Sequence, residues 1–136
     1  MSQEQAEPCQ SFLVIPAPAA QHEAILKFYH THQVLERSQR LGASAGAVVR
    51  SNAAEELVVT SLWESGQHFQ DWVASDERAR ILDSLAQQEI GKDARGWSTH
   101  ATMAADPETV LRDGLSEAFP GRSYEFLTVA IRPTPT

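Results

Sequence analysis

The chain has 136 residues, of which 42% are hydrophobic, and its formal net charge is −7 at pH 7. A chain of this length and composition is typical of a single folded domain with its own hydrophobic core. The acidic balance excludes nucleic acid as an expected partner, because the field of the protein would repel a phosphate backbone.

The polar N-terminal segment and the lack of long apolar runs favour a cytoplasmic protein with no membrane contact. No apolar run approaches the roughly 20 residues that cross a membrane. The segment MSQEQAEPCQ has neither the basic start nor the apolar core of a signal peptide. Residues 1–10 are interpreted as a flexible tail. The single cysteine, Cys9, falls in this tail, so neither an internal disulfide nor a cysteine metal site is expected.

A strand and a long helix are predicted in the first third of the chain. Residues 11–17 (SFLVIPA) form a short apolar run with a proline near its end, which is typical of a strand. A helical period then covers residues 19–40. Four residues recur on one face of this helix: Ile25, Phe28, His32 and Leu35. His30 falls on the opposite face, and His22 is expected at the surface.

Two strands and two helices are predicted in the middle of the chain. The strands cover residues 45–51 and 56–63, which are rich in β-branched side chains. Ser65 then has the position of a helix N-cap, and the inner face of its helix carries Phe69, Trp72 and Val73. Ser75 is a second N-cap, and its helix carries Ile81, Leu82 and Leu85.

One helix and one strand are predicted in the last third of the chain. Residues 91–106 show no period and are predicted to be irregular. A short helix is predicted over residues 106–119, with Pro107 at its first position. The final strand is predicted over residues 124–131. Residues 91–123 therefore form an insertion before the last strand.

The order of these elements predicts an α+β fold with the ferredoxin-like split βαβ pattern and a four-stranded antiparallel sheet. One domain would cover residues 11–132. The predicted strands are apolar on both faces, whereas a sheet with helices on one face would leave the other face to water. The simplest cover is the sheet of a second copy, which predicts a homodimer. The alternative is that the insertion folds over this face.

The stretch LWESGQHFQDWVASDE resembles the antibiotic biosynthesis monooxygenase (ABM) domain superfamily. Members show a strand that ends in W-x-S, then a helix with F-x-x-W and a nearby serine. The matching residues here are Trp63, Ser65, Phe69, Trp72 and Ser75. The stretch ILKFYHTHQVLERS also looks like the first helix of the IsdG-type haem-degrading branch. The resemblance covers roughly residues 11–85 and the last strand. It implies a dimeric α+β barrel with one pocket per subunit, between the sheet and the helices.

The haem-degrading branch places an asparagine, a tryptophan and an iron-ligating histidine in its pocket. Trp72 matches the tryptophan. The asparagine position falls near Ser11 or Phe12, and the histidine position falls at Ile81 or Leu82. Because an aliphatic side chain cannot ligate iron, a haem-binding or haem-degrading protein is an alternative only with altered ligation.

The other branch of the superfamily contains cofactor-independent monooxygenases, which act on polycyclic phenolic substrates. Such chemistry needs an apolar slot, an aromatic wall and a polar group that takes or holds a proton. The resemblance thus implies a small oxidoreductase that acts on an aromatic or polycyclic molecule without a metal or another cofactor. A non-catalytic dimeric binding module is a further alternative, because the asparagine and the histidine are missing.

Five residues are predicted to form the site. His32 is the candidate catalytic group, because an imidazole on an apolar helix face needs a partner and titrates near neutral pH. The alternative is a core histidine bonded to a backbone carbonyl. The predicted substrate-binding residues are Trp72, Phe28, Tyr29 and Phe69. The alternative is core packing for Trp72 and Phe69, and helix-edge packing for Tyr29.

Two further pairs of residues are also candidates. Arg78 and Arg80 could hold a carboxylate or a haem propionate, or pair with neighbouring acids. His100 and Trp97 could belong to a lid formed by the insertion. The sequence shows no catalytic triad, zinc-ligand spacing or phosphate-binding loop.

Overall fold

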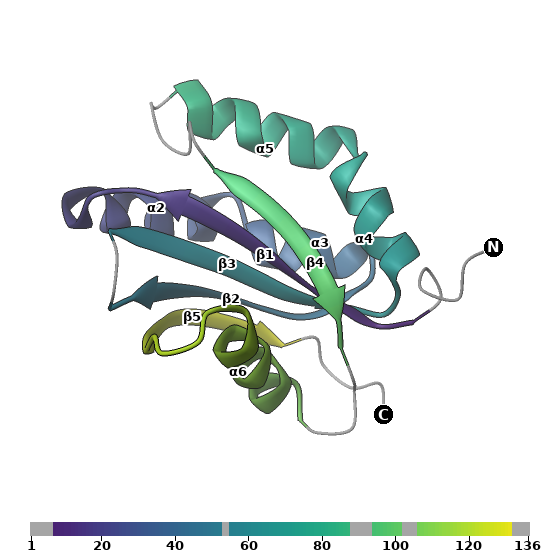
Figure 1. The fold of residues 1–136 in the computed structure, drawn as a ribbon. Helices are drawn as coiled ribbons and strands as arrows, with labels where there is room; N and C mark the ends of the chain where they lie inside the picture. The colour runs from purple at the N-terminus through teal and green to yellow at the C-terminus, as the bar shows by residue number, and fades with distance from the viewer. Residues whose placement is uncertain (1–6, 53–54, 88–93, 102–105, 132–136) are drawn as a thin grey trace.

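The computed structural model describes residues 7–52, 55–87, 94–101 and 106–131 (Figure 1). One antiparallel sheet has the strand order β4-β1-β3-β2-β5. Its strands are β1 (Cys9–Pro16), β2 (Ala43–Ser51), β3 (Glu56–Trp63), β4 (Arg95–His100) and β5 (Tyr124–Ile131). The α+β fold with an antiparallel sheet is confirmed, but the sheet has five strands among the described residues, not the predicted four.

The additional strand, β4, comes from the stretch that was predicted to be irregular. It pairs with β1, with Leu13 opposite Gly96 and Ser11 opposite Ser98. Its sequence, RGWSTH, has one large apolar residue and most of its residues are exposed, so it lacks the apolar period that identifies a strand. This segment therefore forms a strand because it pairs with the hydrogen-bonding edge of β1 that β3 leaves free. Cys9 and Gln10, placed in the tail by sequence, are the first residues of β1.

Five helices accompany the sheet: α2 (Ala19–Thr31), α3 (Val34–Arg40), α4 (Gly66–Val73), α5 (Asp76–Gln87) and α6 (Pro107–Ala118). The predicted N-caps are present. The Ser65 and Ser75 hydroxyls accept from the backbone N–H groups of His68 at 3.2 Å and Arg78 at 3.1 Å. These bonds satisfy amides that have no partner inside the helix.

The helix predicted over residues 19–40 is divided into two. His32 follows the last residue of α2, and Gln33 has a left-handed conformation with φ of 50° before α3 begins. The backbone N–H of Gln33 donates to the carbonyl of His30 at 3.2 Å, which closes α2 with a tight turn. The helical period that joins His32 to Leu35 in the sequence therefore does not continue through this region.

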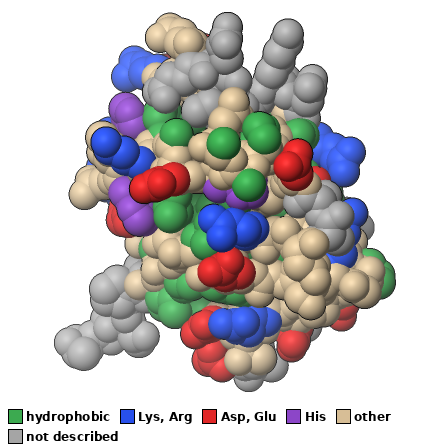
Figure 2. Space-filling view, turned by 90° about the vertical axis from the view of Figure 1, so that its left-hand side faces the viewer, with side chains coloured by type: hydrophobic (Ala, Val, Ile, Leu, Met, Phe, Trp, Pro, Cys, Tyr) green, Lys and Arg blue, Asp and Glu red, His purple; other side chains and the backbone are tan. Residues whose placement is uncertain are grey.

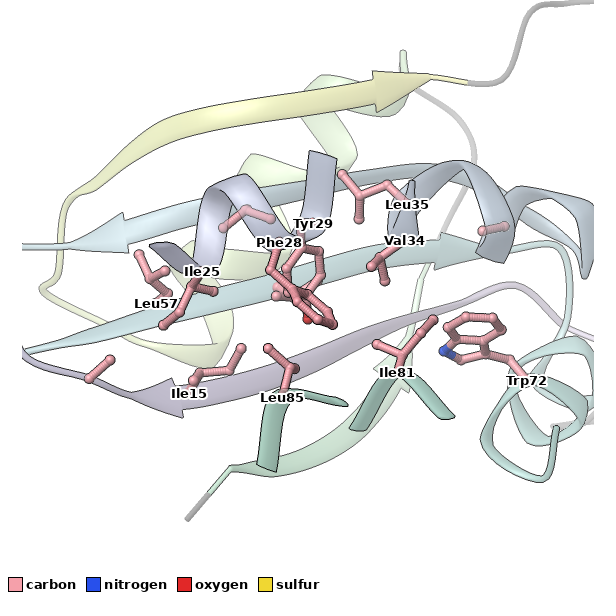
Figure 3. Close-up of a cluster of buried hydrophobic side chains, with 14 of the residues drawn as sticks. Ile15, Ile25, Phe28, Tyr29, Val34, Leu35, Leu57, Trp72, Ile81 and Leu85 are labelled. Atoms are coloured by element: carbon pink, nitrogen blue, oxygen red, sulfur yellow. The ribbon is translucent and has the colours of Figure 1, made fainter. Parts of the chain in front are cut away.

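Helices α2, α3, α4 and α5 cover one face of the sheet and enclose the larger hydrophobic cluster. Figure 3 shows residues from all four helices meeting β1 and β3. The helices contribute Ile25, Phe28, Tyr29, Val34, Leu35, Trp72, Ile81 and Leu85 to this cluster. These positions follow the helical period seen in the sequence, which explains why this layer could be predicted.

The opposite face of the sheet is covered by α6 from the same chain (Figure 1). Val110, Leu111 and Leu115 of α6 pack on an apolar surface of the sheet that includes Phe12 and Leu62. The prediction that a second copy covers this face is therefore wrong, and the alternative, in which the insertion folds over it, is correct. The homodimer stays a prediction.

Helix α6 approaches the sheet closely at Gly114, where an added Cβ would collide with the side-chain amide of Gln10. This buried amide donates to Thr60 Oγ1 at 2.8 Å and to the Leu111 carbonyl at 3.1 Å. It cannot move without breaking both bonds, so the close approach requires a glycine.

We expect Gly114→Ala to lower the free energy of unfolding by about 1–2 kcal/mol, because it displaces a hydrogen-bonded amide. On an exposed helix the same change would stabilise, since alanine has the higher helix propensity. Urea unfolding measures the difference. Ser116→Ala, at an exposed position of α6, is the control and should stay within about 0.5 kcal/mol of the wild type. A stabilised Gly114→Ala protein would contradict this packing.

Figure 2 views the end of the molecule at which β2 and β3 are connected. It shows acidic and basic side chains next to one another. Two ion pairs are consistent with this view: Arg50 of β2 pairs with Glu125 of β5 at 3.1 Å, and Arg122, which precedes β5, pairs with Glu56 of β3 at 2.6 Å. The net negative charge is therefore not gathered into one acidic patch on this face. None of the described helices has the length and apolar character needed to span a membrane.

Candidate functional site

A cavity of about 390 Å³ lies between the sheet and the helices of its larger layer. Strands β1 and β3 form its floor, α2 and α3 one side, and α4 and α5 the other, while β4 borders it at the edge of the sheet. Its size is within the usual range for small-molecule sites. Two of the lining residues, Gln70 and Val73 of α4, are exposed.

Aromatic side chains form much of the cavity wall. The ring of Trp63 lies 5.8 Å from that of Phe69 and 6.1 Å from that of Trp72, measured between centroids. Trp63 is held in place because its indole N–H donates to the Ser11 hydroxyl at 2.9 Å. Trp72 is 9% exposed, and Figure 3 shows its indole nitrogen directed toward the Ile81 side of the cluster. This wall offers flat apolar surfaces to a ligand.

Among the described residues, the titratable side chains of the cavity lining are Tyr29 and Arg78. Burial raises the pKa of the Tyr29 phenol well above its usual value, and the charge of Arg78 partly opposes this shift. Burial lowers the pKa of Arg78, and Tyr29 acts in the opposite direction. The two groups are therefore close enough to influence each other. At neutral pH the phenol stays protonated, and the guanidinium stays charged because arginine begins from so high a pKa.

The structure brings three of the five predicted site residues together. Trp72, Tyr29 and Phe69 line the cavity, whereas Phe28 and His32 do not. The Phe28 ring is buried in the same cluster and lies 4.2 Å from the His32 ring. His32 itself is half-buried at the end of α2. Because α2 ends there, its imidazole lacks the position that a continuous helix would give it, and its catalytic role stays a prediction.

A second histidine of α2, His22, is buried, although it was predicted from the sequence to lie at the surface. Its Nε2 bonds to the Ala17 carbonyl at 2.9 Å, and its Nδ1 accepts from Arg50 Nε at 3.2 Å. These two bonds assign the proton to Nε2. The histidine satisfied by a backbone carbonyl is thus His22. His30 is exposed, as predicted.

Several lining residues were not found from the sequence. Gly96 and Ser98 reach the cavity only because β4 pairs with β1, and no local pattern predicted that pairing. Trp97 is also among the lining residues, while its ring stacks on Phe12 at 5.6 Å and packs with the layer of α6. His100 is exposed and pairs with Glu7 at 3.2 Å. This part of the insertion is therefore a sheet edge beside the cavity.

The lining does not fit a haem held by histidine. Ile81 and Leu82, at the positions where the haem-degrading branch has its ligand, both line the cavity. Within the described part of the chain the lining contains no histidine, and no group of three metal-ligating side chains occurs. The residues present at this site cannot supply the imidazole ligand that the branch uses.

Comparison with known proteins finds similarity in structure only. No protein-family model matches the sequence, and no curated protein is significantly similar to it. A solved structure from Nitrosomonas europaea, named as a candidate antibiotic biosynthesis monooxygenase, has a TM-score of 0.59 at 12% identity. It covers 74% of this chain and 96% of its own. A Caulobacter crescentus protein with the same kind of name has a TM-score of 0.60 at 11% identity, covering 74% and 94%.

A variant of SnoaB from Streptomyces nogalater, named as a cofactor-independent oxygenase, is also similar. Its TM-score is 0.56 at 14% identity, and it covers 74% of this chain and 100% of its own. These structures are matched over almost their whole length, while about a quarter of this chain lies outside the shared part. At such low identity the comparison establishes the fold alone. The resemblance indicated by the sequence is thus confirmed at that level: the chain has the fold of the ABM domain proteins.

Proposed function

We propose that this protein is an oxygenase that acts on an aromatic or polycyclic small molecule bound in the cavity, without a metal or flavin of its own. The cavity wall carries the proposal, because Trp63, Phe69 and Trp72 offer flat surfaces to a planar substrate. The fold shared with a protein named as a cofactor-independent oxygenase supports the same reaction type.

In such a reaction the substrate supplies the electrons. A ring methylene or ring C–H next to a phenol loses its proton, and the resulting carbanion reduces oxygen. For a methylene the balanced change is CH2 plus O2 giving C=O plus H2O, so one oxygen atom enters the product. The protein holds the ring, excludes water and stabilises the developing anion.

Oxygen consumption tests this proposal directly. Purified protein is supplied with a panel of naphthols, hydroquinones and anthrone-type phenols, and incorporation from ¹⁸O₂ is followed by mass spectrometry. We expect Trp72→Leu to lower kcat/KM at least tenfold, because the substrate loses an aromatic wall. Phe126→Leu is the control, since Phe126 packs beside α6 on the other face, and it should stay within twofold. Turnover that does not respond to Trp72→Leu would refute the assignment of the site.

The same assay examines the catalytic role predicted for His32. A loss of turnover in His32→Ala, with binding preserved, would support that role. Unchanged turnover would assign the proton transfer to the substrate or to solvent instead.

A non-catalytic binding module is the second candidate. It is favoured by one observation: among the described residues, the lining contains no carboxylate and no histidine that could act as a general base. Saturable binding of an aromatic ligand without oxygen consumption across the whole panel would establish this alternative.

A further inference from the structure

The charge of the cavity is opposite to that of the whole chain. The chain carries a formal net charge of −7, yet Arg78 is the charged side chain among the described residues of the lining. Arg78 is half-buried, and within the described ranges no carboxylate lies at ion-pair distance from its guanidinium. A partly desolvated cation without a counter-charge in a cavity attracts an anionic ligand.

Two further donors at the cavity, the Tyr29 hydroxyl and the Trp72 indole N–H, also have no hydrogen-bond acceptor among the described residues. Tyr29 is 3% exposed and Trp72 is 9% exposed. In the part of the chain that the structure describes, neither the Tyr29 hydroxyl nor the Trp72 indole N–H makes a hydrogen bond. Neither atom is among the fully buried polar atoms without a partner, so both are open to the cavity. Three donors that line one cavity and lack acceptors are a site for a ligand rich in acceptor oxygens.

We propose that the cavity binds a flat aromatic ligand that bears one carboxylate, with the carboxylate held by Arg78 and Tyr29 and the ring packed on Trp72. A carboxylate has two oxygens in one plane, so the guanidinium and the phenol can each donate to it. A single negative charge matches the single guanidinium, whereas a phosphate dianion would need a second cation. This inference rests on the proposed function in one respect, namely that this cavity is the ligand site.

Isothermal titration calorimetry with three naphthalenes tests the inference. The probes are 1-naphthoate, its neutral isostere 1-naphthamide, and 1-naphtholate at alkaline pH as the phenolate alternative. We expect the wild type to bind 1-naphthoate at least tenfold more tightly than 1-naphthamide. Arg78→Gln should weaken 1-naphthoate binding at least tenfold and leave 1-naphthamide within twofold. Tyr29→Phe, which removes the hydroxyl alone, should weaken 1-naphthoate about threefold to tenfold.

Arg80→Gln is the matched control, because Arg80 lies on the same helix, is exposed and does not line the cavity. It should bind both probes as the wild type does. Equal binding of naphthoate and naphthamide by the wild type, an unchanged preference in Arg78→Gln, or no binding of either probe would overturn the inference. A stronger preference for the naphtholate would replace the carboxylate by a phenolate and would also overturn it.

The readout is equilibrium binding, so its failure can be separated from failure of the proposed function. A protein that consumes no oxygen can still prefer the anion. Conversely, an oxygenase with a neutral substrate would turn over a phenol and show no preference between the two naphthalenes.

Discussion

Leu111→Ala is expected to lower the free energy of unfolding by about 2–5 kcal/mol, the usual range for truncating a fully buried leucine. Leu111 is 0% exposed at the centre of the contact between α6 and the sheet. Its backbone carbonyl also accepts from the Gln10 amide at 3.1 Å, so movement of α6 into the space would strain that bond. Urea or thermal unfolding, followed by circular dichroism, gives the change.

Asp113→Ala provides the control for this prediction. Asp113 is an exposed residue of the same helix, and its replacement should change stability by no more than about 0.5 kcal/mol. Equal stability of the two variants would mean that α6 does not hold the second face of the sheet. In that case the apolar face of the sheet would again need a cover, as in the homodimer predicted from the sequence.

The thiol of Cys9 should react about a hundredfold more slowly in the folded protein than in the unfolded chain at pH 8. Burial raises the pKa of this thiol from 9.0 to about 11, which lowers the reactive thiolate fraction by that factor. The side chain is also 6% exposed, so a reagent has little access. Because Cys9 is the single cysteine, the rate with Ellman's reagent, with and without urea, reports on this group alone. Equal rates would contradict its burial.

The same raised pKa predicts a loss of stability in alkali. Below about pH 9 the thiol is protonated in both the folded and unfolded states, so its contribution is complete. As the pH rises toward 11 the unfolded chain loses the proton first, and stability falls. The raised pKa of Tyr29 likewise predicts that stability falls as the pH increases, but at higher pH than for Cys9. Cys9→Ser should therefore lose less stability than the wild type between pH 8 and 10.5, and an identical pH profile would contradict the assignment.

The sequence by itself determined the elements that carry a strong local signal. The strand that ends at Trp63, the N-caps at Ser65 and Ser75, and the inward position of Trp72 were all predicted and are all present. Each of them depends on hydrogen bonds within one turn or on the period of side chains along one element. Such signals are complete within a few residues, so one sequence is enough to read them.

Only the tertiary structure decided which segments lie side by side. The pairing of β4 with β1, the placement of α6 on the second face and the break of the helix at Gln33 had no local pattern. For the same reason the sequence indicated His32 from a continuous helical period, whereas Arg78 and Tyr29 are the residues that line the cavity. Contacts between residues far apart in the chain depend on which edges and faces remain unsatisfied after the local elements form, and that becomes defined only in the folded molecule.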